Sequence, residues 1–335
     1  FVNVFWRSLA FWSGMLWDPK RLPTIAYDFD KQVHTSLREA MSLAPWRMRL
    51  GMKLFMPKSF SEVKDMKKLS SSFLRKAPKE SGQGIWEYVE EVSKKGEHYF
   101  RIYESSDCWG FDNVGARLGF AGIGAMAGML KALEKEERDW NVVETKCIGM
   151  GAPYCEFKMV PGENGELKDF LEAIDSSVVE KVHSRLMEQL IGFLLHGKPL
   201  PGRPRLGSGI AFNRVMTVTS GPALFSERYR MALRMGGAKA GKEVGEHLMN
   251  TGMGEDEIIR RVIDFMDYCK VGKVTVDETI RIKENCEVFG LETGELTCFF
   301  TTGFLNGLFS AVKNQHVREI KCIAAGDPYC EWEII

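Results

Sequence analysis

Two stretches of sequence, KCIGMGAPYCEF at residues 146–157 and KCIAAGDPYCEW at residues 321–332, decide how the chain is organised. They are identical at eight of twelve positions, which chance does not explain. A glutamate precedes each stretch at the same distance, Glu144 in one case and Glu319 in the other. The sequence therefore predicts two diverged copies of one module, which end near residues 160 and 335.

Each copy is predicted to contain the same elements in the same order. A mostly helical first half leads into strands, which share an Arg-Ile pair at 101–102 and 281–282. A helix rich in small residues follows, and the repeated stretch forms a final hairpin. The expected strands are 98–102 and 273–282, the expected helices 116–131 and 296–312, and the expected hairpins 142–160 and 317–335. This order predicts a mixed α/β (α+β) fold, in which helices flank a mainly antiparallel sheet that ends in a metal-binding hairpin.

The segment between the copies separates two domains. Apolar residues follow helical spacing from Phe170 to Phe193, Gly197 ends that pattern, and a Pro- and Gly-rich linker comes next. The predicted division is an aromatic N-terminal arm at 1–20, a first domain with a divergent first half at 21–160, a connecting helix and linker at 161–208, and a second domain at 209–335. The arm is expected to be either an interfacial helix or a segment packed on the protein body or a dimer partner.

Composition excludes several classes of protein. The chain has 335 residues, is 44% hydrophobic and 27% charged, and has a formal net charge of zero. Because no apolar run approaches the roughly 18 residues of a membrane helix, we expect no membrane span, and cytoplasmic localisation follows by default. Eight cysteines without a visible export signal or an Asn-x-Ser/Thr site favour metal binding over a disulfide framework.

The second copy contains a complete set of metal ligands. Glu319, Cys322 and Cys330 lie in the hairpin, where a Gly-Asp-Pro turn folds one cysteine back beside the other, and Cys298 lies on the preceding helix. Three thiolates and one carboxylate suit structural zinc, with every position filled by protein and none left for substrate. The alternative is that these cysteines are small buried hydrophobic residues or a disulfide pair.

The first copy repeats only part of this set. Glu144, Cys147 and Cys155 match the hairpin ligands, but Leu118 or Gly119 corresponds to Cys298. Two alternatives follow: Cys108 supplies the fourth ligand from a neighbouring strand, or the first copy holds no metal. We therefore expect one zinc ion in the chain and allow for a second.

The Glu-x-x-Cys-(seven residues)-Cys pattern, preceded by a Cys-bearing helix with Gly303-Phe304, resembles the vinyl-4-reductase domain family. The same fold is similar to the effector-binding domain of phenol- and xylene-responsive activators and to a trafficking-complex subunit that buries an acyl chain. The resemblance implies zinc on Cys298, Glu319, Cys322 and Cys330, and a small apolar ligand enclosed beside the hairpin. It also implies a homodimer or an intramolecular pseudo-dimer. The chain has no room for the activators' ATPase or DNA-binding domain, so a sensor of this kind signals through a protein partner.

The candidate ligand-lining residues lie on the helix that faces each hairpin, and core packing is the alternative role for each. They are Phe120, Met126, Phe299, Phe300, Phe304 and Phe309. The glycine-rich stretch 236–242 has the spacing of a phosphate-binding loop, but Glu243 replaces its Ser/Thr and helical residues surround it. A basic stretch at 46–80 suits an acidic partner or, more simply, a solvated helix face.

No catalytic constellation stands out, so no catalytic residue is predicted. The leading hypothesis is a zinc-containing protein that binds a hydrophobic or aromatic small molecule as a sensor or carrier. The alternative is a non-catalytic accessory or scaffold subunit of an enzyme complex in aromatic or tetrapyrrole metabolism. A reductase is the weakest candidate, because no residue set supplies a hydride-donor site or an acid catalyst.

Overall fold

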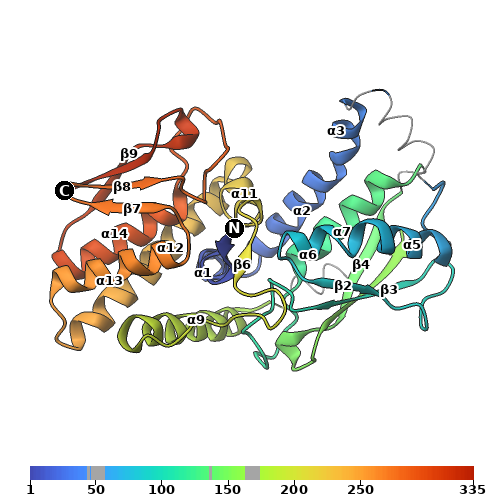
Figure 1. The fold of residues 1–335 in the computed structure, drawn as a ribbon, viewed down its shortest axis with the longest axis horizontal. Helices are drawn as coiled ribbons and strands as arrows, with labels where there is room; N and C mark the ends of the chain where they lie inside the picture. Colours follow the sequence, from blue (N-terminus) through green and yellow to red (C-terminus); the bar gives the residue numbers. More distant parts are fainter. Residues whose placement is uncertain (44–45, 47–56, 136–137, 163–173) are drawn as a thin grey trace. The chain divides into compact units, whose positions relative to one another are not determined.

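The computed structural model describes residues 1–43, 46, 57–135, 138–162 and 174–335 (Figure 1). These residues form two compact units. The outer unit comprises Phe1–Leu22 and Ser176–Ile335, and the inserted unit comprises Pro23–Asp175. The N-terminal segment and the connecting helix thus belong to the outer unit together with the second copy, whereas the sequence division set them apart as an arm and a linker.

The outer unit is built on a four-stranded antiparallel sheet with strand order β7-β8-β10-β9. Its strands and 3-10 turn are β7 (Lys273–Val276), β8 (Thr279–Lys283), β9 (Val317–Lys321), η3 (Ile323–Ala325) and β10 (Cys330–Ile334). Its main helices are α1 (Val4–Met15), α9 (Ser176–His196), α12 (Glu227–Asn250), α13 (Glu255–Tyr268) and α14 (Phe299–Lys313). Smaller elements are β1 (Val2–Asn3), β6 (Gly209–Ile210), α10 (Asn213–Met216) and α11 (Ser220–Phe225). The long helix predicted after residue 170 is present as α9, and residues 163–173 lie outside the described residues.

The inserted unit has a second antiparallel sheet with the equivalent order, β2-β3-β5-β4. Its strands and 3-10 turn are β2 (Ile85–Tyr88), β3 (His98–Tyr103), β4 (Trp140–Lys146), η2 (Ile148–Met150) and β5 (Cys155–Pro161). Its helices are α2 (Leu22–Thr35), α3 (Leu37–Leu43), α5 (Val63–Leu69), the π-helix η1 (Ser70–Leu74), α6 (Ala77–Glu80) and α7 (Phe120–Leu133). The predicted fold class, antiparallel sheets flanked by helices, is confirmed in both units.

Glycines allow the main helix pair of each unit to pack in backbone contact. A Cβ atom on Gly307 of α14 would lie 2.0 Å from the carbonyl oxygen of Ala238 on α12, and one on Gly241 would lie equally close to that of Phe304. In the inserted unit, Gly128 of α7 approaches the carbonyl of Lys31 on α2 in the same way. The stretch 236–242 is therefore part of a close-packed helix and not a phosphate-binding loop.

The aromatic N-terminal segment is a buried helix of the outer unit. Every residue of α1 is buried, and the Trp6 ring contacts the rings of Phe300 and Phe304 at centroid distances of 5.4 and 5.5 Å. β1 pairs with β6 and ties the start of this helix to the first residues of the second copy. Within the described residues, no helix is both long enough and apolar enough to cross a bilayer.

Candidate metal centres

A hairpin with a 3-10 turn forms the core of each candidate centre. In β4–β5 the turn η2 ends at Gly151 with φ 87°, and in β9–β10 the turn η3 ends at Gly326 with φ 102°. This left-handed conformation favours glycine, which both copies provide. The turn places Cys147 beside Cys155, and Cys322 beside Cys330, inside the unit and at the base of the hairpin.

The inserted centre consists of Cys108, Glu144, Cys147 and Cys155. One ligand atom from each of the four residues lies within 4.8 Å of the others, and all four residues are fully buried. The Cys147 sulfur is 3.6 Å from that of Cys108 and 3.9 Å from that of Cys155. Cys108 reaches this group from the turn that follows β3, rather than from a strand. The first copy thus brings together four residues that could hold a metal ion.

The outer centre consists of Cys298, Cys322 and Cys330, with Glu319 beside them. The Cys298 sulfur is 3.6 Å from that of Cys322 and 3.3 Å from that of Cys330, and these three sulfurs form the compact group. Glu319 is not part of that group, and its Oε2 accepts a hydrogen bond from Thr302 Oγ1 at 3.1 Å. The second copy, complete in sequence, therefore brings three of its four expected ligands into one group, whereas the first copy brings four.

The two glutamates share a feature that fits a cation-binding site. In each, Oε2 accepts a hydrogen bond, from the Gly119 N–H to Glu144 and from the Thr302 hydroxyl to Glu319. The other oxygen, Oε1, is buried without a hydrogen-bond partner in both. Burial raises the pKa of Glu319 to about 8 and raises that of Glu144 well above its ordinary value. A buried carboxylate oxygen of this kind requires a proton or a metal ion.

One thiol of each centre is stabilised as a thiolate. Hydrogen bonding to the sulfurs of Cys108 and Cys155 lowers the pKa of Cys147 to about 3. The backbone N–H groups of Leu118 and Gly149 also donate to its sulfur, at 3.4 and 3.3 Å. The neighbouring sulfurs of Cys298 and Cys330 likewise lower the pKa of Cys322. Since the thiolate is the metal-binding form of cysteine, both hairpins are prepared for a cation.

The third sulfur, which lies outside the hairpin, comes from a different element in each unit. Cys298 is the N-cap residue of α14, and Gly119 is the N-cap residue of α7. A Cβ atom on Gly119 would lie only 3.0 Å from Glu144 Oε1, so the glycine makes room for this carboxylate. Cys108 compensates for the missing cysteine. Sequence comparison alone left this exchange open, because one extra residue before Gly119 obscures the alignment.

Comparison with known proteins places the outer centre in a described domain. Residues 279–335, from the first residue of β8 to the C-terminus, match the V4R domain family. We call this segment the V4R domain, after the family that it matches. It contains all four residues of the second-copy ligand set. The family resemblance predicted from the hairpin motif is confirmed for residues 279–335.

Two proteins from Methanocaldococcus jannaschii are similar to parts of the chain. An uncharacterized protein is 34% identical over 92 residues, which cover 23% of this chain and 40% of that protein. The chain therefore spans less than half the length of this curated relative. The crystal structure of a vinyl-4-reductase family protein matches with a TM-score of 0.25 and 16% identity, over 30% of this chain and 66% of that one.

The structure divides the six candidate ligand-lining residues between the units. Phe120 and Met126 are buried on α7, whereas the other four lie on α14 of the V4R domain. Phe300 and Phe304 pack on Trp6, and the Phe299 ring lies under the Arg230 and Arg234 guanidinium groups. Phe309 lines a cavity of about 660 Å³. These residues therefore do not form one pocket.

Sequence reasoning missed a polar relay outside the V4R domain. Ser13 Oγ lies 3.3 Å from His183 Nδ1, and Glu243 Oε2 lies 2.7 Å from His183 Nε2. The relay joins α1, α9 and α12 at the edge of a cleft of about 860 Å³. Because Ser13 is fully buried, the arrangement holds three helices together rather than presenting a nucleophile. The residues are too far apart in sequence to suggest the relay.

Proposed function

We propose that the chain is a zinc-containing, non-catalytic protein that binds a hydrophobic or aromatic small molecule and acts as a sensor or carrier. The observation that carries the metal part is the pair of buried Cys/Glu groups, each with an unpartnered Glu Oε1. The family that residues 279–335 match, and the resemblance to aromatic-sensing domains, support the ligand part.

The spacing of the sulfurs suits zinc. A tetrahedral ion with metal–sulfur bonds of about 2.3 Å holds its sulfur ligands roughly 3.8 Å apart. The sulfur–sulfur distances are 3.6 and 3.9 Å in the inserted centre, and 3.3 and 3.6 Å in the outer centre. Bound zinc would supply structural bracing, because Cys108, Cys147, Cys155 and Glu144 fill four positions of the inserted centre and leave none for substrate.

Each hairpin would depend on this bracing. The base of the hairpin buries three sulfurs and one carboxylate, which repel one another when ionised. A dication removes that repulsion and gives the Glu Oε1 atom its missing partner. Metal binding is then coupled to the folding of both units.

Elemental analysis and native mass spectrometry of the purified chain test the metal part. We expect two zinc ions per chain, one fewer in Cys108→Ser, and one fewer in Cys322→Ser. The control is Cys269→Ala, because Cys269 is equally buried and belongs to neither centre. Its zinc content should match that of the unaltered chain. A chain without metal, or a Cys108→Ser variant that keeps both ions, would contradict the assignment.

The same spectra test the ligand part, because a retained small molecule adds its mass to the native chain.

An accessory or scaffold role remains the second candidate, and one observation favours it. The 860 Å³ cleft between α1, α9 and α12 is lined by Trp17 and Met235, which are 52% and 44% exposed. Co-purification of a stable protein partner without any bound small molecule would favour that role over the proposed one.

A further inference from the structure

The outer unit contains a cavity that is remote from its metal centre. The cavity has a volume of about 660 Å³ and lies between α13, β7 and the last turns of α14. Its apolar wall consists of Ile259, Ile263, Val274, Val276, Phe309 and Ile334. Fifteen residues of helix separate Cys298 from Lys313 at the cavity, which corresponds to roughly 22 Å along α14. A ligand here would therefore not touch the metal ligands.

Strand register gives the matching positions in the inserted unit. Ile102 pairs with Trp86 on β2, and Ile282 pairs with Val274 on β7. By the same register Tyr88 corresponds to Val276, and His98 corresponds to Glu278. Val274, Val276 and Glu278, which line the cavity, thus correspond to the aromatic residues Trp86, Tyr88 and His98 in the inserted unit, where Trp86 and His98 are buried.

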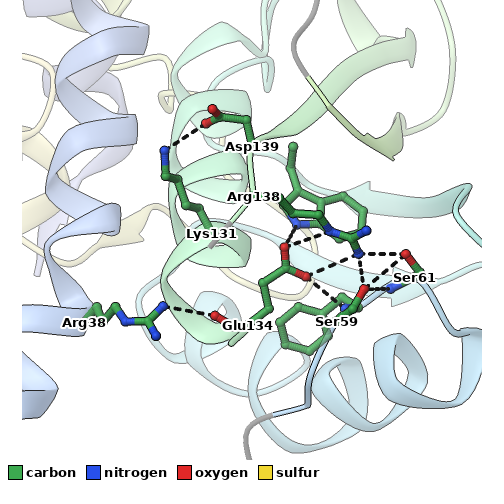
Figure 2. Close-up of polar contacts among 9 residues, drawn as sticks. Arg38, Ser59, Ser61, Lys131, Glu134, Arg138 and Asp139 are labelled. Carbon is green, nitrogen blue, oxygen red and sulfur yellow. Dashed lines mark hydrogen bonds and ion pairs between the residues drawn. The ribbon is translucent and has the colours of Figure 1, made fainter. Parts of the chain in front are cut away.

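The inserted unit also places a segment of its own chain at the equivalent helix end (Figure 2). Glu134 follows Gly119 by fifteen residues, as Lys313 follows Cys298, so the two residues are equivalent. Glu134 is fully buried, and its Oε2 accepts the backbone N–H of Phe60 at 3.0 Å.

Further hydrogen bonds fasten this segment. Arg138 bonds to Glu134 and to the hydroxyl groups of Ser59 and Ser61, and the Ser61 carbonyl accepts the Gly96 N–H in the β2–β3 turn. Phe60 is only 2% exposed. The inserted unit therefore fills this region with its own Phe60. The backbone N–H of Phe60 donates a hydrogen bond to the Glu134 carboxylate and holds the residue in place.

The outer unit has the opposite charge at the position that Glu134 occupies in the inserted unit. Lys313 replaces Glu134, and Arg260 on α13 lines the same cavity. Within the described residues Arg260 has no acidic partner, and Lys313 pairs at 2.7 Å with Asp256, whose side chain is 93% exposed. The other two acids at the cavity, Asp277 and Glu278, lie exposed in the β7–β8 turn. A ligand in this cavity would thus meet two cations, which can bind an anionic group. The equivalent place in the inserted unit holds an anionic group instead, the Glu134 carboxylate.

We propose that this cavity binds an aromatic carboxylate, with the ring against the partly exposed side chains of Ile263, Val276 and Ile334 and the carboxylate on Lys313 and Arg260. The inference rests on the proposed function and specifies its ligand and site. Burial of the ring supplies most of the affinity, and the two cations supply the preference for an anion. The inserted unit, whose own Phe60 is buried at the equivalent place, is not the site of this binding.

Calorimetric titration of the zinc-loaded chain with 2-naphthoate and its neutral analogue 2-naphthamide tests the proposal. We expect naphthoate to bind roughly fivefold or more tightly, since partly exposed ion pairs contribute up to about 1 kcal/mol each. Lys313→Met should remove most of this preference. Asp256→Asn should increase it, because the variant frees Lys313. The control Lys242→Met, an exposed lysine paired with Glu246 on α12, should leave it unchanged.

Val274→Trp, which copies Trp86 of the inserted unit, should abolish binding of both compounds while zinc content stays the same. Equal affinity for the two compounds, or an unchanged preference in Lys313→Met, would overturn the carboxylate assignment and leave the proposed function intact. Undiminished binding in a folded Val274→Trp variant would overturn the site. Failure of 2-naphthoate to bind overturns the proposal of an aromatic carboxylate, whereas absence of metal from the unaltered chain would count against the proposed function.

Discussion

Substitution of Gly307 by alanine should destabilise the outer unit, although alanine is the better helix former. In an exposed helix this change stabilises by about 1 kcal/mol. Here the added Cβ would lie 2.0 Å from the Ala238 carbonyl oxygen and 2.8 Å from the backbone nitrogen of Lys242. Both of these atoms belong to backbone, so neither can move aside as a flexible side chain can.

The magnitude follows from the overlap. A carbon and an oxygen in contact lie about 3.2 Å or more apart, so α12 and α14 must separate by roughly 1 Å. Overpacking of this kind costs about 3 kcal/mol at the upper end of its usual range. After subtraction of the propensity gain, the variant should lose about 2 kcal/mol of unfolding free energy.

Urea unfolding, followed by tryptophan fluorescence and far-ultraviolet circular dichroism, measures this loss as a lower midpoint with an unchanged slope. The matched control is Gly192→Ala in α9, where the nearest atom to the added Cβ is Lys198 Cδ at 3.4 Å. That variant should be more stable by up to about 1 kcal/mol. If both substitutions shift the midpoint in the same direction, the account of the helix pair is wrong.

Three other predictions concern the polar contacts. Thr302→Val removes the hydroxyl that holds Glu319, so competition with a chromophoric chelator should show roughly tenfold weaker metal binding at the outer centre alone. Chelation of the metal should lower the melting temperature of the unaltered chain, and the Cys108→Ser/Cys322→Ser double variant should melt at the same low temperature with or without chelator. Burial opposes ionisation of Glu243, but hydrogen bonds from His183 and Lys239 outweigh it and lower the pKa. Since the pKa of Glu243 in the folded chain lies below the unfolded value of about 4.3, ionised Glu243 stabilises the fold above that pH. This stabilisation declines as the pH falls through the folded pKa. The unfolding midpoints of Glu243→Gln and the unaltered chain should therefore converge in acid.

The end of each copy could be predicted from sequence because its physical signals are local. The repeated cysteines, the turn glycines Gly151 and Gly326 and the alternating apolar residues all lie within one hairpin. The predicted hairpin 142–160 is observed as β4 and β5, and the predicted helix 296–312 is observed as α14. The relay at His183 could not be predicted, since its partners lie on helices that only tertiary packing brings together.

The first half of the first copy could not be aligned because its similarity lies in packing rather than in residue identity. α2 has little sequence in common with α12, yet Gly128 of α7 meets the backbone of α2 as Gly307 of α14 meets that of α12. In the inserted unit the glycines at this contact, Gly124 and Gly128, lie on α7, and the nearest atoms of α2 are the backbone carbonyl oxygens of Tyr27 and Lys31. A helix that is contacted through its carbonyl groups is free to change its side chains.

The same reasoning explains why sequence favoured the outer centre, whereas in the structure the inserted centre brings together four ligands and the outer centre three. A ligand set read from sequence counts residues, but a metal centre requires that their side chains fit together. At the inserted centre the loss of the N-cap cysteine removes a Cβ that would crowd Glu144, and the carboxylate instead accepts the freed helix N–H of Gly119. At the outer centre the N-cap cysteine stays, and Thr302 holds the glutamate beside the three sulfurs. The difference between Cys298 and Gly119 at the helix N-cap is therefore coupled to the position of the Glu319 or Glu144 carboxylate. Cys108 keeps the number of ligands at four in the inserted centre, although it lies earlier in the chain than the helix N-cap.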